Sequence, residues 1–175
     1  AGAARLVTTL AATGSQVLST AAQAVVDGIP VTCSVRLVES EGYISIADGV
    51  SVFSWGYSTA GSPMQLPGPT LILTEGDTFD VTLTNSLPAA AGNVSIVFPG
   101  LEVSATSGGV QGDLTQEAVP GVNVSYTVTL SVPGTFQYQR GEHPDLQVEM
   151  GLYGAIVVTP SAPAAPCTTP TIASG

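Results

Sequence analysis

The sequence is poor in positive charge. Its 175 residues include no lysine, and the only cations are Arg5, Arg36 and Arg140. Set against 13 carboxylates, these leave a formal net charge of −10, so nucleic acids and anionic membrane surfaces are poor partners. Charged residues make up 9% of the chain, well below the roughly 25% of an ordinary soluble domain. We interpret the acidic balance as a source of solubility rather than as the sign of a particular substrate.

The chain also lacks a long apolar segment. No run of about 18 apolar residues is present, so the sequence predicts no transmembrane segment. The first 28 residues are apolar, but polar residues interrupt them and the basic start of a signal peptide is missing. This pattern favours a processed, mature chain.

Only two cysteines occur, Cys33 and Cys167, near opposite ends of the sequence. If paired, they would close a loop of more than a hundred residues, worth roughly 4–5 kcal/mol in the chain-entropy model, and would imply an oxidising compartment. Two buried thiols, or bonds between subunits, remain open alternatives. Asn93 and Asn123 each begin an Asn-Val-Ser glycosylation pattern, which matters only in a glycosylating host.

Several catalytic classes lack their sequence signatures. The chain has many serines but a single histidine, and no Gly-x-Ser-x-Gly elbow, P-loop or dinucleotide-binding fingerprint occurs. We therefore expect no catalytic residue of these classes.

The sequence is rich in segments that predict β-strands. Apolar and polar residues alternate with a period near two in several segments, as in strands with one buried face. The expected inward residues are Phe79, Val81 and Leu83; Val94, Ile96 and Phe98; and Val122, Val124, Tyr126, Val128 and Leu130. Residues 151–158, GLYGAIVV, form a nearly continuous apolar run, typical of a strand buried on both faces. Short strands separated by Gly- and Pro-rich turns indicate an all-β antiparallel sandwich.

The two ends differ from this middle. We predict an N-terminal apolar arm over residues 1–28, a β-domain over residues 29–160, and an extended Pro-rich tail over residues 161–175. The arm fits either a short helix over Ser15–Val26 or added strands near Leu6–Leu10 and Val17–Leu18. Glu39–Gly42 is expected to form a bend or hairpin tip.

Residues 35–160 resemble a known family. LPGPTLILTEGDTFDVTLTNSLP, NVSIVFPG and GTFQYQRG followed by MGLYGAIVV are similar, in order and spacing, to segments of the first cupredoxin domain of multicopper oxidases. The resemblance implies an eight-stranded, cupredoxin-like Greek-key β-sandwich and secretion.

The same resemblance identifies missing copper ligands. Val97 and Pro99 stand where the family has His-x-His, and Gln139 and Gly141 stand where it has His-Ser-His, so all four positions hold non-ligands. Arg140 is expected to place a cation where a metal would lie. A type 1 copper site in one chain needs two His and a Cys, but His143 is the only histidine and neither cysteine lies in the expected loop.

The remaining candidates for metal binding are sparse. His143 lies near Glu142, Asp145 and Glu149, with Met150 or Met64 as a further candidate ligand. This group suits an adventitious surface metal site or a pH-sensitive link to Arg140, but a solvated loop is the favoured interpretation.

Two acidic pairs and one aromatic residue complete the candidates. The pairs Glu75/Asp77 and Glu39/Glu41 lack the ligand spacing of a calcium loop, which favours solvated turns. Trp55 is expected to pack in the core.

Two functional hypotheses follow. The first is a secreted, non-catalytic structural protein without a cofactor, located outside the cell or on its surface. It would form homo-oligomers or filaments as the arm of residues 1–28 adds a strand to a neighbour. The alternative is a copper-binding or electron-transfer domain of a multicopper oxidase-type protein.

Overall fold

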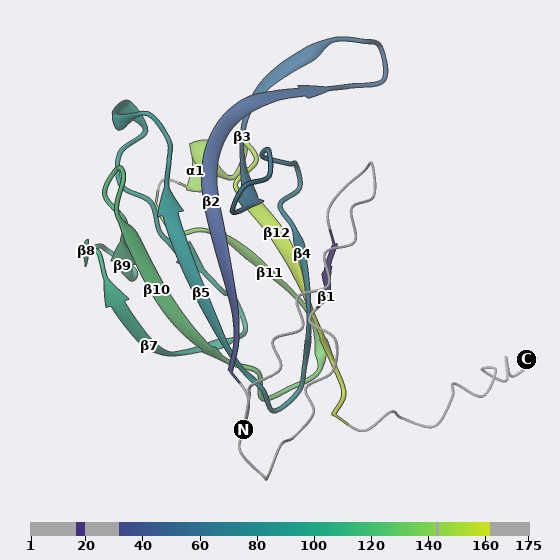
Figure 1. Cartoon of the computed structure of the whole chain (residues 1–175), viewed down its shortest axis with the longest axis vertical. Coiled ribbons are helices and arrows are strands. Elements are labelled where there is room, and N and C mark those ends of the chain that lie inside the picture. Colours follow the sequence, from purple (N-terminus) through teal and green to yellow (C-terminus); the bar gives the residue numbers. More distant parts are fainter. Residues whose placement is uncertain (1–16, 20–31, 143, 162–175) are drawn as a thin grey trace, which may run out of the picture.

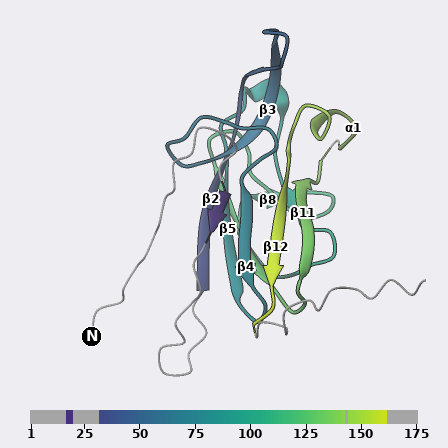
Figure 2. The same cartoon turned by 90° about the vertical axis from the view of Figure 1, so that its right-hand side faces the viewer.

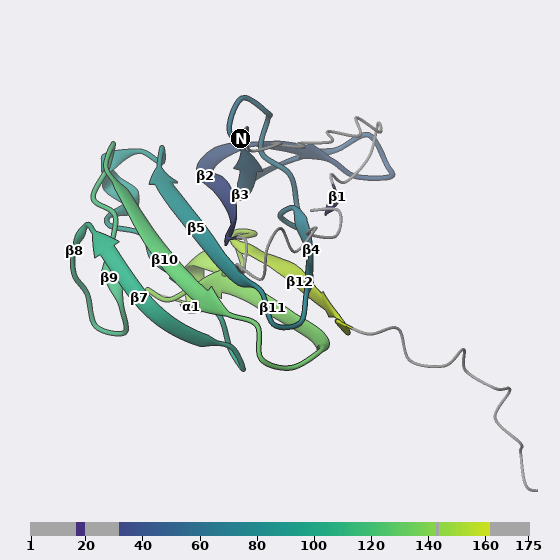
Figure 3. The ribbon, with the colours of Figure 1, turned by 60° about the horizontal axis from the view of Figure 1, so that its bottom comes forward.

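The computed structural model describes residues 17–19, 32–142 and 144–161. They form two five-stranded sheets that face each other and a small two-stranded sheet (Figures 1 and 3). The first sheet has the order β1 (Val17–Ser19), β4 (Thr70–Thr74), β12 (Tyr153–Thr159), β11 (Gly134–Arg140) and β6 (Ile96–Val97). The second has the order β3 (Ser51–Thr59), β2 (Thr32–Ser45), β5 (Thr78–Asn85), β10 (Asn123–Thr129) and β7 (Glu102–Gly108). The predicted all-β sandwich is confirmed, but the expectation of an antiparallel one is only partly right, because β4 pairs in parallel with β1 and β12, and β2 pairs in parallel with β5.

The chain crosses repeatedly between the two sheets. It passes from β3 to β4, back to β5, across to β6 and back to β7, so neighbours in sequence are seldom neighbours in a sheet. The short pair β8 (Val110–Gln111) and β9 (Gln116–Glu117) precedes β10. The helical turns are η1 (Ala89–Ala91) and α1 (Pro144–Gln147), and α1 lies beside β3 at one end of the sandwich (Figures 1 and 2).

The core is formed by the apolar residues that alternate with polar ones in the sequence. Phe79, Val81 and Leu83 of β5 are at most 1% exposed, and Val124, Tyr126 and Val128 of β10 match them. β5 pairs in antiparallel register with β10 and in parallel register with β2, so these side chains share the inner face of the second sheet. Residues Val94, Ile96 and Phe98 are buried as predicted.

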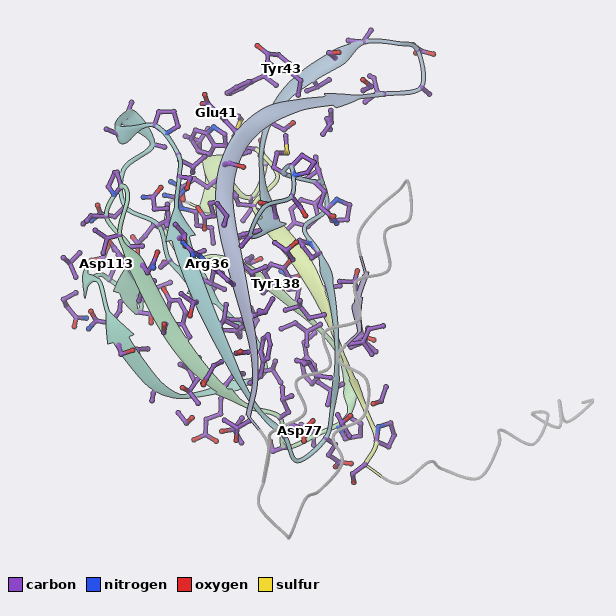
Figure 4. All side chains as sticks on the ribbon, viewed as in Figure 1. Arg36, Glu41, Tyr43, Asp77, Asp113 and Tyr138 are labelled. Carbon is purple, nitrogen blue, oxygen red and sulfur yellow. The ribbon has the colours of Figure 1, made fainter. Side chains whose placement is uncertain are left out.

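Three local predictions are wrong. Val122 is 41% exposed because it precedes β10 in a turn. In β12, Gly154, Ile156 and Val158 are buried while Tyr153 is exposed, so only one face of this strand is fully covered. The predicted hairpin tip at Glu39–Gly42 is wrong: β2 curves near Glu41 but runs as one strand to Ser45, and the hairpin turns to β3 after it (Figure 4). Backbone pairing with β3 holds β2 extended through a segment whose polar residues suggest a turn.

Candidate functional site

Three of the four positions that correspond to family copper ligands are neighbours at the edge of the first sheet. Val97 of β6 and Gln139 of β11 are Cα partners in antiparallel register. Gly141, buried, follows β11, and a Cβ added to it would lie 3.0 Å from Val97 Cγ1. Pro99 lies two residues beyond Val97 and is exposed. The fold therefore brings together the positions that the resemblance singled out.

Gly141 is closed in by its surroundings. A Cβ at this position would lie 2.7 Å from Oγ of Ser95, which is shorter than real Cβ contacts. Ser95 is itself 0% exposed, so it has little room to move. A histidine at position 141 would have to displace this neighbour before its ring reached the outer face.

Arg140 does not lie where a copper ion was expected. Successive side chains of a strand point to opposite faces, so Arg140 faces away from Gln139 and into the core, where it is 0% exposed. Its Nη1 lies 3.6 Å from Oε2 of Glu39, which is also 0% exposed. Its Nη2 donates hydrogen bonds to the backbone carbonyls of Ala91, at 3.4 Å, and Asn93. The prediction that Arg140 occupies the metal position is therefore wrong.

This ion pair joins the two sheets. Glu39 lies on β2 of the second sheet and Arg140 on β11 of the first, so the pair crosses the core. Tyr57 of β3 is the antiparallel partner of Glu39 and packs edge-on against Tyr138 of β11, with ring centroids 5.2 Å apart. Figure 4 shows Tyr138 between the sheets, and its hydroxyl donates a 2.7 Å hydrogen bond to the carbonyl of Pro69.

Burial dominates the electrostatics of the pair. It raises the pKa of Glu39 to about 8, and the positive charge of Arg140 and the Tyr57 hydroxyl offset only part of that rise. Burial likewise lowers the pKa of Arg140 and raises that of Tyr57. The prediction that Glu39 belongs to a solvated acidic turn is therefore wrong, whereas its neighbour Glu41 is exposed on the β2–β3 hairpin (Figure 4).

Asn85 organises the loop that leads toward the ligand positions. It is 1% exposed, and its Nδ2 donates to the carbonyls of Gly92, at 3.0 Å, and Ala118, at 3.1 Å. Its Oδ1 accepts a 3.1 Å hydrogen bond from the Leu87 N–H. The Asn-x-Leu end of the sequence motif therefore has a structural role: it fixes the chain between β5 and β6.

Comparison with known proteins identifies the family. The sequence model described as multicopper oxidase matches residues 45–163. The chain belongs to the multicopper oxidase family. Over 99 residues it is 38% identical to laccase abr2 from Aspergillus fumigatus, covering 55% of this chain and 16% of that protein. Over 113 residues it is 35% identical to an L-ascorbate oxidase from Brassica rapa subsp. pekinensis, covering 61% of this chain and 19% of that protein.

Solved structures agree with this assignment. A multicopper oxidase from Pseudomonas thermotolerans superimposes with a TM-score of 0.65 at 25% identity, covering 78% of this chain and 32% of that one. A copper nitrite reductase from Nitrosomonas europaea gives a TM-score of 0.60 at 27% identity, covering 77% and 45% of the two chains. The chain thus has the cupredoxin-like fold of a multicopper oxidase domain and spans less than half of these relatives.

The residues at the family copper positions do not fit copper. Imidazole nitrogen and cysteine sulfur are the ligands that copper prefers in such sites. Val97, Pro99 and Gly141 offer no ligating side chain, and the amide of Gln139 accepts a hydrogen bond from Gln137 Nε2. Among the described residues, no three His, Cys, Asp or Glu side chains lie together in a way that could hold a metal ion.

The other metal and disulfide candidates are only partly placed. His143, Cys167 and the side chains of Cys33 and Asp145 lie outside the described residues, so the histidine site and the disulfide stay predictions. Met64 is half-buried and lies over Gly42 and Gly56, as expected of a gap filler. Across the described ranges, no helix has the length and apolar character to span a membrane.

The side chains of the two glycosylation patterns are engaged in hydrogen bonds. Asn93 Nδ2 donates to Oε2 of Glu117 at 2.9 Å, and Asn123 Oδ1 accepts from the Thr84 hydroxyl at 2.9 Å.

Proposed function

We propose that this chain is a non-catalytic, copper-free cupredoxin domain that works outside the cell as a structural module and associates with copies of itself. The observation that carries the proposal is the chemistry of the four family ligand positions, where Val97, Pro99, Gln139 and Gly141 supply no imidazole or thiolate. Arg140 between the last two is committed to the core by Glu39. In this chain the family fold keeps its core packing.

Exposed apolar side chains on one hairpin support a role in protein association. The β2–β3 hairpin projects beyond the sandwich, and Tyr43 lies on its projecting part (Figures 1 and 4). Tyr43 is 72% exposed and Phe53 43%, with their rings packed edge-on at 5.5 Å. Ile46 and Val50 at the turn are also about half exposed. A cluster of this kind on a soluble domain is a typical protein contact surface.

The N-terminal arm supplies a second means of association. Within the described part of the arm, Val17–Ser19 pairs in parallel register with Thr70–Ile72 of β4 in the same chain. Exchange of this strand between two copies would reproduce the same hydrogen bonds between chains, which is a low-cost route to oligomers. Repeated exchange in one direction would give open filaments.

The test of assembly is the native mass of the full chain. Light scattering and negative-stain microscopy are expected to show oligomers or filaments. Removing residues 1–28 should shift the protein toward monomer, whereas removing residues 162–175 should not. A full chain that stays strictly monomeric at high concentration would overturn the assembly proposal.

A copper-binding or electron-transfer domain is the second candidate, favoured by family membership and by relatives named as laccase and L-ascorbate oxidase. Because the chain spans 16% and 19% of these two relatives, other parts of a larger oxidase would supply the ligands. Metal analysis and the visible absorption spectrum after copper loading separate the candidates. Stoichiometric copper with a thiolate or type 2 signature would establish this second function in place of the first.

A further inference from the structure

The β2–β3 hairpin ends in a two-stranded ribbon that has one edge of β2 open. β2 pairs with β5 only as far as Glu39, whereas its pairing with β3 continues to Ser45. Residues 40–53, called the ribbon below, project beyond the sandwich (Figures 1 and 4). Within the described ranges, no strand pairs with the other edge of β2 from Ser40 onward. A two-stranded hairpin is at best marginally stable by itself in water, so this edge is suited to a third strand.

Both faces of the ribbon carry apolar side chains that a third strand would cover. Tyr43 and its partner Phe53 lie on one face, and Ile44 and its partner Val52 lie on the other. Tyr43 is 72% exposed and Val52 is 40% exposed. Glu41 is exposed on the same face as Tyr43, and it forms no ion pair within the described structure (Figure 4). A matching strand therefore needs apolar residues on both faces and a cation beside Glu41.

Residues 5–10, with the sequence RLVTTL, have this pattern. They lie outside the described residues, and the sequence analysis predicts a strand there as one alternative. Laid parallel to β2, the segment forms three cross-strand pairs on one face: Arg5 with Glu41, Val7 with Tyr43, and Thr9 with Ser45. Opposite charges, an aromatic with a β-branched residue, and two hydroxyl side chains are pairs that stabilise neighbouring strands. On the other face, Leu10 comes beside Ile46, which is 47% exposed.

The charges of the chain also select this segment. The chain has three cations; Arg140 lies in the core ion pair and Arg36 donates a hydrogen bond across the second sheet, which leaves Arg5. The charged residues of the ribbon, Glu41 and Asp48, are both acidic. Packing one ribbon against another would bring carboxylates together, whereas residues 5–10 bring the opposite charge. The arm therefore fits the open edge better than a second ribbon does.

The direction of a parallel strand favours an arm from a neighbouring copy. β2 runs outward from the sandwich, so a parallel segment would end beside Ile46 at the outer end of the ribbon (Figure 1). Residues 11–16 then connect the segment to β1, and six residues span at most about 20 Å. A chain that leaves at this outer end leads away from the sandwich that carries the ribbon, and toward a β1 that belongs to another copy.

We propose that residues 5–10 of one copy add as a third strand, parallel to β2, to the open edge of the ribbon of a neighbouring copy. This inference rests on the association of copies proposed above and names the two surfaces that meet. The pairing between β1 and β4 within each chain stays intact. Because the donor segment and the open edge are different surfaces, the contact is heterologous and its repetition gives open filaments.

Hydrogen exchange of the full chain, read by mass spectrometry on peptides covering residues 40–46, tests the pairing. Amides on the open edge should exchange at least tenfold more slowly in the assembled protein than in a chain that lacks residues 1–10. Arg5→Glu should reduce this protection at least threefold, and Arg5→Glu/Glu41→Arg should restore it. Arg5→Glu/Asp48→Arg is the matched control and should not restore it, because Asp48 lies at the turn, away from the pair.

A backbone variant tests the strand without changing charge. Val7→Pro removes an N–H and disrupts the ladder, so the protection of residues 40–46 should be lost. Ala12→Pro lies outside the pairing segment and should leave the protection unchanged. Both positions precede the described domain, so neither variant alters the core.

The native mass of the same samples separates failure of this contact from failure of the assembly. Oligomers in which residues 40–46 exchange as fast as in the shortened chain would overturn the ribbon contact alone. Monomers in which these residues are protected would overturn pairing between copies, because the ribbon would then be covered within one chain. Equal restoration by Glu41→Arg and Asp48→Arg would overturn the parallel register.

Discussion

Replacing Arg140 by methionine tests whether the buried pair is controlled by the protonation of Glu39. The pKa of Glu39 is raised to about 8, from an ordinary value of 4.5. Between these values the folded protein holds a proton that the unfolded chain releases. The free energy of unfolding of the wild type should therefore fall as pH rises through this window, by at most about 1.4 kcal/mol per pH unit.

The expected cost of Arg140→Met depends on pH. At pH 6 Glu39 is mostly neutral, and the main loss is the donor to the carbonyls of Ala91 and Asn93, worth about 1–3 kcal/mol. At pH 9 the wild type contains an ionised pair, and removing the guanidinium leaves a buried carboxylate without its cation. Because the wild-type pKa is about 8, ionisation of Glu39 adds at most about 1.4 kcal/mol to this cost between pH 6 and pH 9. The cost of Arg140→Met should therefore grow with pH.

Glu39→Gln should behave in the opposite way. Glutamine resembles the protonated carboxyl, so we expect a change within about 1 kcal/mol at pH 6 and a variant more stable than wild type at pH 9. The double variant Glu39→Gln/Arg140→Met should lose the pH dependence of Arg140→Met. Tyr57 and Tyr126 also face Glu39, but their pKa values are raised, so both stay neutral over this range.

Urea unfolding at pH 6 and pH 9 measures these differences. The chain has no lysine and one histidine, so few other groups titrate in the interval, and subtracting the double variant removes their contribution. Arg36→Met is the matched control: Arg36 is exposed and donates a 3.1 Å hydrogen bond to Thr84, so its cost should be small at both pH values. An equal cost of Arg140→Met at the two pH values would refute the reasoning.

Three further substitutions test the packing around the site by urea unfolding. Asn85→Ala should cost roughly 2–4 kcal/mol, because the buried Leu87 N–H loses its acceptor and the carbonyls of Gly92 and Ala118 each lose a donor; a cost below 1 kcal/mol would contradict this. Gly154→Ala should cost at least about 1–3 kcal/mol, because the added Cβ would overlap the Tyr138 ring, and unchanged stability would show that the ring moves freely. Tyr126→Phe should cost about 1–3 kcal/mol, because its hydroxyl donates a 2.6 Å hydrogen bond to the Gln116 carbonyl, and a neutral result would mean that water replaces it.

Period-two patterns predict most of the strands correctly. β5 and β10 have unbroken alternation, and their inward residues are the ones buried in the structure. The sandwich follows from the number of such segments and the turns between them, and the family resemblance gives its topology. Neither the alternation nor the family resemblance predicts the curvature of the β2–β3 hairpin, which depends on pairing across many residues.

The buried ion pair was harder to predict because it breaks the rule that inward positions are apolar. Leu37 and Glu39 occupy the same phase of β2, and Tyr138 and Arg140 the same phase of β11. A carboxylate and a guanidinium that both occupy inward-facing positions of their strands therefore indicate a buried ion pair. The polar composition of the stretch from Glu39 favours a turn, which conflicts with its inward phase.

The alternation of β11 also explains how ligands can be absent while the fold persists. Gln139, at a position that the resemblance assigns to a family ligand, points to the outer face, whereas Tyr138 and Arg140 hold the core between the sheets. Substitution at such an outer position creates no cavity in the core, because the inner residues are unaffected. Histidines in place of Val97 and Gln139 should therefore be tolerated structurally. A histidine in place of Gly141 should not, because Ser95 occupies the space that its Cβ needs. At Gly141 the closed space beside Ser95 is a steric obstacle to a histidine.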